Sequence, residues 1–238
     1  MYNQLRVEFY KLKTSFVFYG FLLFFVILGI SYGVLKLAPI GETGYDVFSD
    51  TVGDTSLMFT LTLFVSYFIG NDFSTRTIQN EIQIGYSRLS AMLVRMIVVL
   101  PATALFHLTY VFSTMLTVTA INGFGTEISV RDMLIKTVLV IIQVMAVQSF
   151  TILIMFICKK NTLGTVISII FTSITCNILR NYLGEENVLF KFTSFYRIMM
   201  NSKPMTANEL SISFLSAFIT LIVVLYVTHI AFRRTEIK

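Results

Sequence analysis

The residues of this sequence that could carry out a chemical reaction are few, and they are widely separated along the chain. His107, Ser113 and Cys158 offer an imidazole, a hydroxyl and a thiol, which are groups that nucleophilic catalysis uses. Such catalysis also needs a base within hydrogen-bond reach of the nucleophile, and no recognisable motif links these three residues. A membrane-embedded protease or lipid-modifying enzyme is therefore the least favoured function, and we expect no catalytic residues.

Metal and nucleotide chemistry are no better represented. Cys158 and Cys176 have no second pair of ligands nearby, so a zinc site or a structural disulfide is not expected, and we interpret both as packed apolar thiols. No G-x-x-x-x-G-K-[ST] loop occurs, and this loop is what cradles nucleotide phosphates in many ATPases. We therefore expect no metal and no cofactor in this chain.

Polar residues inside apolar stretches are candidates for a transport pathway or gate. His107 is a possible proton relay, but no acidic residue lies in the same stretches, so a neutral histidine bonded to a neighbouring helix is favoured. Pro101 predicts a kink, which is either a gate or a packing feature. Gln143 and Gln148 either hydrogen-bond across helices or line a substrate path, and packing is again favoured.

Helices in a membrane are the elements that must position these side chains. The chain has 238 residues, of which 55% are hydrophobic and 13% charged, whereas soluble domains carry about 25% charged residues. A spanning helix needs about 20 mostly apolar residues and satisfies its own backbone in lipid. We therefore predict an all-α, polytopic membrane protein with six transmembrane helices, at residues 16–35, 56–69, 96–119, 135–157, 163–179 and 212–232.

The loop charges predict the orientation of these spans. Six crossings place both termini on one side, and that side receives 11 of the 18 lysine and arginine residues. Because cytoplasmic loops are enriched in these residues, we expect a multi-pass protein of the cytoplasmic membrane with both termini in the cytoplasm. The net charge of +5 reflects this bias and gives no reason to expect nucleic acid as a partner.

Residues 1–14 predict an amphipathic helix that lies in the headgroup layer. Tyr2, Leu5, Phe9 and Leu12 recur at helical spacing and form an apolar stripe. Glu8 and Lys11 are spaced for an ion pair within one helix turn. The alternative is a frayed, positively charged tail that serves only to fix the topology.

The most informative segment is the polar stretch between the second and third spans. Residues 74–85 predict a short cytoplasmic helix, started by Ser74 or Thr75 and ended by Gly85. Ser87 is placed to cap the next span, and Arg88 and Arg95 are expected to reach the headgroups. Since a short turn would be enough as a connector, a polar helix here suggests a docking surface for another protein.

This segment resembles the first coupling helix of ABC type-2 permeases, the membrane subunits of one class of exporter. The matching residues are Asp72, Phe73, Arg76, Thr77, Ile78, Asn80, Gly85, Arg88 and Arg95, with Arg95 where a lysine is commoner. The form with Asn80 and Gly85 is similar to permeases of bacitracin or lantibiotic immunity. The segment Val7–Lys13 also looks like the elbow helix of the family, and the six spans extend the resemblance over nearly the whole chain.

The resemblance implies partners and contact sites. A separate nucleotide-binding ATPase subunit would hold ATP and Mg and would contact Arg76, Thr77, Ile78, Gln79, Asn80, Glu81 and Gly85. Lys159, Lys160 and Asn161, in the turn between the fourth and fifth spans, would form a second cytoplasmic contact. A chain with six spans is half a transporter, so a second permease chain, giving a homodimer, is implied. Residues 180–210 would form a re-entrant or lid segment on the outer side.

The leading hypothesis is therefore a permease subunit of an ATP-driven exporter. Its expected substrates are hydrophobic or amphipathic molecules, such as antimicrobial or toxin-like peptides or drugs, taken from the cell or the membrane. The alternative is a secondary transporter or channel that works without ATP. Ion-coupled carriers usually need buried carboxylates or broken helices near the membrane midplane, and neither is evident in this sequence.

Overall fold

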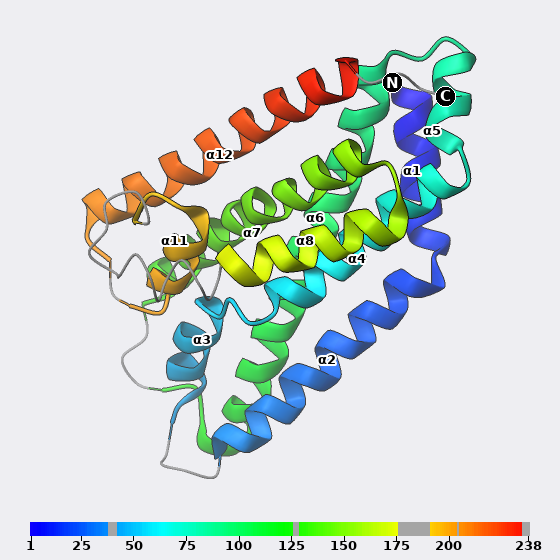
Figure 1. Cartoon of the computed structure of the whole chain (residues 1–238). Coiled ribbons are helices and arrows are strands. Elements are labelled where there is room, and N and C mark those ends of the chain that lie inside the picture. Colours follow the sequence, from blue (N-terminus) through cyan, green and yellow to red (C-terminus); the bar gives the residue numbers. More distant parts are fainter. Residues whose placement is uncertain (38–41, 126–128, 176–190, 204, 235–238) are drawn as a thin grey trace.

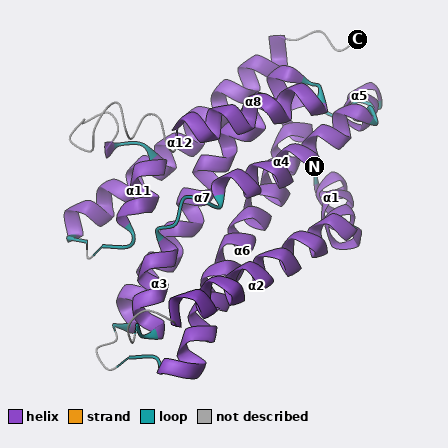
Figure 2. Cartoon of the chain, turned by 60° about the horizontal axis from the view of Figure 1, so that its bottom comes forward, coloured by secondary structure: helices purple, strands orange, loops and turns teal. Residues whose placement is uncertain are grey.

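The computed structural model describes residues 1–37, 42–125, 129–175, 191–203 and 205–234, and the regular structure in these ranges is helical (Figures 1 and 2). This confirms the predicted all-α class for the described part of the chain. The fold is a bundle of long helices, with shorter helices at its two ends.

Four helices are long and apolar enough to cross a membrane. They are α2 (Phe16–Leu37), α6 (Arg88–Asn122), α7 (Val130–Cys158) and α12 (Ala207–Arg234). Each contains one of the predicted spans, and α6 and α7 are longer than predicted, at 35 and 29 residues. The composition of these helices indicates a membrane protein.

The other two predicted spans fall on shorter helices. α4 (Met58–Ser74) has 17 residues and the described α-helical part of α8 (Asn161–Ser173) has 13, whereas a full crossing takes roughly 20 residues. The two helices pack against each other and against α7. Residues 176–179 of the predicted fifth span lie outside the described residues, as do Cys176 and the first part of the predicted outer segment.

The bundle is organised around α6, which packs against α2, α3, α4 and α7. At the α2–α6 contact, Gly29 and Gly33 lie directly on the α6 backbone. A Cβ atom at Gly29 would come within 2.7 Å of the Tyr110 carbonyl oxygen, so these glycines allow a close approach of the two helices. Nearby, the buried Phe106 ring stacks on Phe25, with 5.7 Å between the ring centroids.

The two ends of the bundle carry different elements (Figure 1). α1 (Tyr2–Thr14), α5 (Thr77–Gln83), the turn between α7 and α8, and the C-terminal end of α12 lie at one end. At the opposite end lie α3 (Gly44–Val52) and α11 (Ser194–Met200). The N-terminus and the last described residues of α12 are thus at the end that holds α5.

The structure gives the surroundings of two residues of α6, Arg88 and Pro101. Arg88 was expected to reach the headgroups, but its guanidinium donates to the carbonyl oxygens of Phe232 and Arg233, at 3.0 and 2.7 Å, and so binds the last turn of α12. The last carbonyl groups of a helix are those that its own N–H groups can leave available, which explains the attraction. Pro101, where the sequence predicts a kink, lies on an exposed face of α6, and the residues on both sides of it belong to the same helix.

Candidate functional site

The predicted polar helix is present as α5, and it begins three residues later than expected. The predicted caps are wrong: the Ser74 hydroxyl donates to the Gly70 carbonyl and the Thr75 hydroxyl to the Asn71 carbonyl, so both side chains turn back onto α4. α5 instead follows Arg76, whose φ of 58° places it in the left-handed region and makes the sharp bend between the two helices.

The end of α5 is as predicted. Gly85 has a φ of 104°, a conformation that glycine adopts without steric cost. The Tyr86 N–H donates to the Glu81 carbonyl and the Gly85 N–H to the Ile82 carbonyl, which is the hydrogen-bond pattern of a Schellman motif. Ser87 then caps α6 by accepting from the Ser90 N–H, at 3.1 Å, as its position in the sequence predicts.

α5 has a buried face and an exposed face. Ile78 is 1% exposed and packs into the core, so this predicted contact residue is not available to a partner. Glu81 also faces inward. The exposed residues of α5 and the turns that flank it include Arg76, Asn80, Gln83, Ile84, Gly85 and Tyr86, of which Ile84 is 79% exposed. A solvent-exposed isoleucine at the tip of a polar helix is a suitable apolar anchor for a protein contact.

Arg95 connects α5 to the interior of the bundle. The sequence predicts that its side chain reaches the headgroups, but this is wrong, because Arg95 has no exposed surface. Its Nε atom lies 2.7 Å from Oδ2 of Asp72 on α4. Its two Nη atoms each lie 3.0 Å from an oxygen of Glu81 on α5, which is a bidentate pairing. Nη2 lies 3.4 Å from Oε1 of Glu8 on α1.

Helix α1 completes this arrangement with its polar face. Lys11 pairs with Asp72 and lies 3.4 Å from Glu8, so the predicted pair within α1 is present. Gln4 donates to Glu81 at 3.3 Å. We use the name ion cluster for Glu8, Lys11, Asp72, Glu81 and Arg95.

The burial pattern of α1 differs from the predicted one. Gln4, Glu8 and Leu12 are buried against the bundle, whereas Tyr2 and Phe9 of the predicted apolar stripe are exposed. The predicted apolar stripe is therefore only partly buried. The interior of the bundle holds the Arg95 cation, and polar side chains of α1 turn inward toward it.

The ion cluster holds three carboxylates and two cations. Desolvation by burial raises the pKa of Glu8 above its ordinary value, and the nearby Asp72 carboxylate adds to this, while Arg95 and Lys11 act in the opposite direction. Buried ion pairs add little net stability compared with apolar packing, but removing one partner leaves an uncompensated charge and is strongly destabilising. The cluster therefore fixes how α1, α4, α5 and α6 sit relative to one another.

The predicted second contact lies at the same end of the bundle. Lys159 has a φ of 52° and ends α7, Lys160 precedes the first residue of α8, and Asn161 begins α8. Together with Ser74, at the end of α4, these residues line an open groove of about 720 Å³. The structure thus places both predicted contact regions at one end, and the groove adjoins the residue from which the chain turns into α5.

The predicted pathway residues do not form one site. Gln148 bonds the Met58 carbonyl of α4 at 3.2 Å, and Gln143 accepts from Asn201 at 2.7 Å; both glutamines are fully buried. Through these hydrogen bonds, Gln143 and Gln148 link neighbouring segments of the bundle, which is the packing role that the sequence favoured for them. His107 is also fully buried, and it lies within electrostatic reach of Asp54, an acidic neighbour that the sequence did not suggest.

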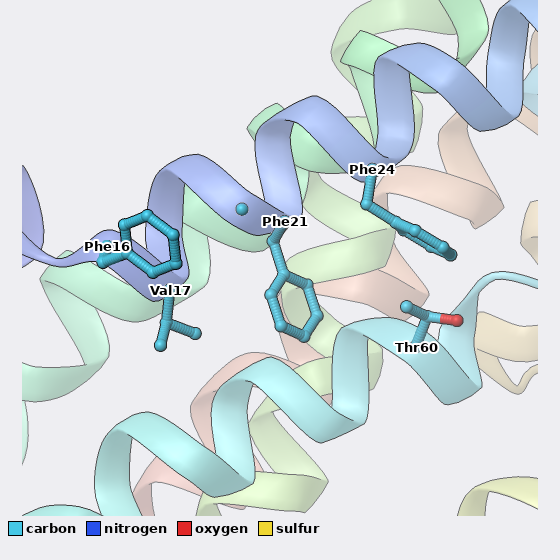
Figure 3. Close-up of a pocket in the computed structure, with 6 residues that line it drawn as sticks. Phe16, Val17, Phe21, Phe24 and Thr60 are labelled. Carbon is cyan, nitrogen blue, oxygen red and sulfur yellow. The ribbon is translucent and has the colours of Figure 1, made fainter.

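The side of the bundle carries an apolar pocket of about 380 Å³ between α2 and α4 (Figure 3). Figure 3 shows Val17 and Phe21 directed from α2 toward α4, where Thr60 lines the other wall. Because its lining is almost wholly hydrocarbon, the pocket suits an apolar chain rather than a polar solute. No pattern in the sequence predicts this pocket.

Neither a scan against protein-family models nor a search among curated proteins finds a match to this chain.

Proposed function

We propose that this chain is the membrane-spanning subunit of an ATP-binding-cassette exporter, and that it moves hydrophobic or amphipathic molecules out of the cell or the membrane. A separate subunit would bind ATP and Mg and hydrolyse the ATP. The observation that carries the proposal is the construction of α5. Its outer face, with Asn80, Gln83 and Ile84, is exposed at the end of the bundle, while Glu81 on its inner face is held by Arg95 in the interior.

This construction suits a helix that transmits motion. A partner that pushes on the exposed tip would move Glu81, and the bidentate pairing would carry that movement to Arg95 and hence to α6. Asp72 would carry the movement to α4, and Glu8 and Lys11 would carry it to α1. Because a packed, hydrogen-bonded cluster deforms little, the helices would shift together rather than one at a time.

The proposal includes a topology and an oligomeric state. In it, α4 and α8 complete the six crossings, and the lysine and arginine distribution places α1, α5 and both termini in the cytoplasm. A second copy of the chain completes the transport path. α2 and α12 are the long helices with the least buried surface, so we expect them to face lipid or the second copy.

Purification of the tagged chain from its native membranes in a mild detergent tests the proposal. We expect a polypeptide with a nucleotide-binding loop and ATPase activity to copurify with the wild type. The double variant Asn80→Ala, Ile84→Asp should lose that ATPase while keeping its elution volume in gel filtration, because both side chains are exposed. Tyr2→Ala, at an exposed position of α1, is the control and should retain the ATPase.

The outcome separates the hypotheses. Absence of an ATPase from the wild-type preparation would refute the exporter assignment, and undiminished ATPase in the double variant would refute the role of α5.

A second candidate function is ion-coupled transport without ATP. The observation that favours it is Glu8, a buried carboxylate whose pKa is raised by burial. Against it, Glu8 lies 3.4 Å from both Arg95 and Lys11, as structural carboxylates do. Uptake driven by a proton gradient in liposomes that contain this chain alone, and lost in Glu8→Gln, would support this candidate.

A further inference from the structure

A pocket of about 230 Å³ lies beside α11 and the first turn of α12, at the opposite end of the bundle from α5. It shares no residue with the candidate site described above. α11 is held in place by Phe195 and Ile198, which are buried, and it packs against α7 and α12. The pocket is therefore built on a fixed element, and Arg197 contributes to its wall.

Arg197 is an unusual residue in such a wall. It is 7% exposed, and its Nε atom is buried without a hydrogen-bond partner. In the described part of the chain, its guanidinium makes no ion pair, and its nearest aromatic contact is the Tyr196 ring, 5.8 Å away. Burial lowers the pKa of Arg197, although an arginine stays protonated at any ordinary pH. A buried charge of this kind is strongly stabilised by an anion.

The charges around the pocket also favour an anion. Among the described residues that line it, Arg197, Lys191 and Lys203 are cationic and Glu209 is acidic. The Glu209 carboxylate accepts hydrogen bonds from the N–H and the hydroxyl of Thr206, at 2.8 and 2.9 Å, and so caps the start of α12. Among the described ion pairs it has none with Arg197, and its charge acts on that guanidinium only at longer range, so no described carboxylate pairs directly with Arg197.

The remaining walls are apolar. Met200, Met205 and Ile212 border the cationic side of the pocket. The volume is smaller than the roughly 300–1,000 Å³ of sites that enclose a whole drug-sized ligand, so the pocket fits a compact head rather than a complete molecule. The planar guanidinium of arginine matches the oxygens of a phosphate better than an ammonium does.

We propose that this pocket binds the phosphate head of an amphipathic anion, with Arg197 and Lys203 on the phosphate and Met200, Met205 and Ile212 against the hydrocarbon. The anion is either an anionic membrane phospholipid or a soluble alkyl phosphate, since the two share the same head chemistry. The proposal does not depend on the ATPase partner.

Native mass spectrometry of the detergent-purified chain tests the proposal. The probes are phosphatidylglycerol, dodecyl phosphate, inorganic phosphate, and diacylglycerol as the matched lipid without phosphate. We expect Arg197→Gln to weaken phosphatidylglycerol binding by about tenfold or more, as for the loss of a hydrogen bond to a charged group. Lys203→Gln, at an exposed position, should weaken it less. Arg131→Gln removes an exposed arginine outside the pocket and should leave binding unchanged.

The outcomes decide between the alternatives. Binding of dodecyl phosphate without binding of phosphatidylglycerol would support the site and assign it to a soluble anion. Equal affinity of phosphatidylglycerol for the wild type, Arg197→Gln and Lys203→Gln would overturn the proposal, and so would equal affinity for diacylglycerol. If Arg197→Gln does not fold, the comparison of Lys203→Gln with Arg131→Gln decides.

Discussion

Replacement of Arg95 by glutamine tests how the ion cluster holds the bundle together. The change removes the cation that is paired with Asp72, Glu8 and Glu81 and leaves three carboxylates with Lys11 alone. Breaking a buried pair on one side costs about 3–5 kcal/mol. Since 1 kcal/mol corresponds to about 2–4 °C in Tm for a chain of this size, we expect Tm to fall by about 6–20 °C.

The assay is thermal unfolding of the detergent-purified protein, followed by size-exclusion chromatography of the heated samples. Arg6→Gln is the control, because Arg6 is an exposed arginine on α1 outside the ion cluster. Acidification should return part of the lost stability to Arg95→Gln, because protonation neutralises the carboxylates that the variant leaves unpaired. A Tm within about 2 °C of the wild type, well below the expected loss, would show that the carboxylates do not depend on Arg95.

Two further substitutions test single contacts. Gly29→Ala should lower Tm by an amount equivalent to about 1–3 kcal/mol, because its methyl group would meet the Tyr110 carbonyl. Gly20→Ala is the control: a Cβ atom there would have no atom within 4 Å, so Tm should stay unchanged or rise. Equal effects of the two variants on Tm would contradict the close contact of α2 and α6. Glu8 has a raised pKa in the folded protein, so its contribution to stability is fully present below its unfolded pKa and is lost as the pH rises through the folded value. Glu8→Gln should therefore reduce the gain in Tm on going from neutral pH toward pH 4.5, and an identical pH profile in the variant would contradict this assignment.

Features set by neighbouring residues could be predicted from the sequence. Gly85 ends α5 and Ser87 caps α6, because a positive φ and an N-terminal hydroxyl depend on a few adjacent residues. The long apolar runs likewise predict α2, α6, α7 and α12, since length and composition are enough to indicate a helix that can cross a membrane.

The ion cluster could not be predicted in this way, because its members come from distant parts of the chain. Lys11 and Asp72 are 61 residues apart, and no local pattern pairs them. The same pairing explains why the helix extends beyond the predicted second span, which ends at Ile69, before the polar residues. α4 continues to Ser74 because Arg95 and Lys11 neutralise Asp72 inside the bundle. A usable signal was present in Arg95 itself, an arginine within an apolar run, which requires an internal partner.

The chemistry of the cluster leads to a final prediction that separates stability from coupling. Apolar residues of similar volume often replace a buried ion group without loss of stability. The triple variant Arg95→Met, Asp72→Leu, Glu81→Met should therefore recover most of the Tm that Arg95→Gln loses. It should nevertheless lose ATP-driven transport in proteoliposomes, because apolar contacts can slide, whereas the bidentate pairing of Glu81 with Arg95 fixes the direction of α5. Transport at the wild-type rate in a stable triple variant would show that the cluster only holds the helices together.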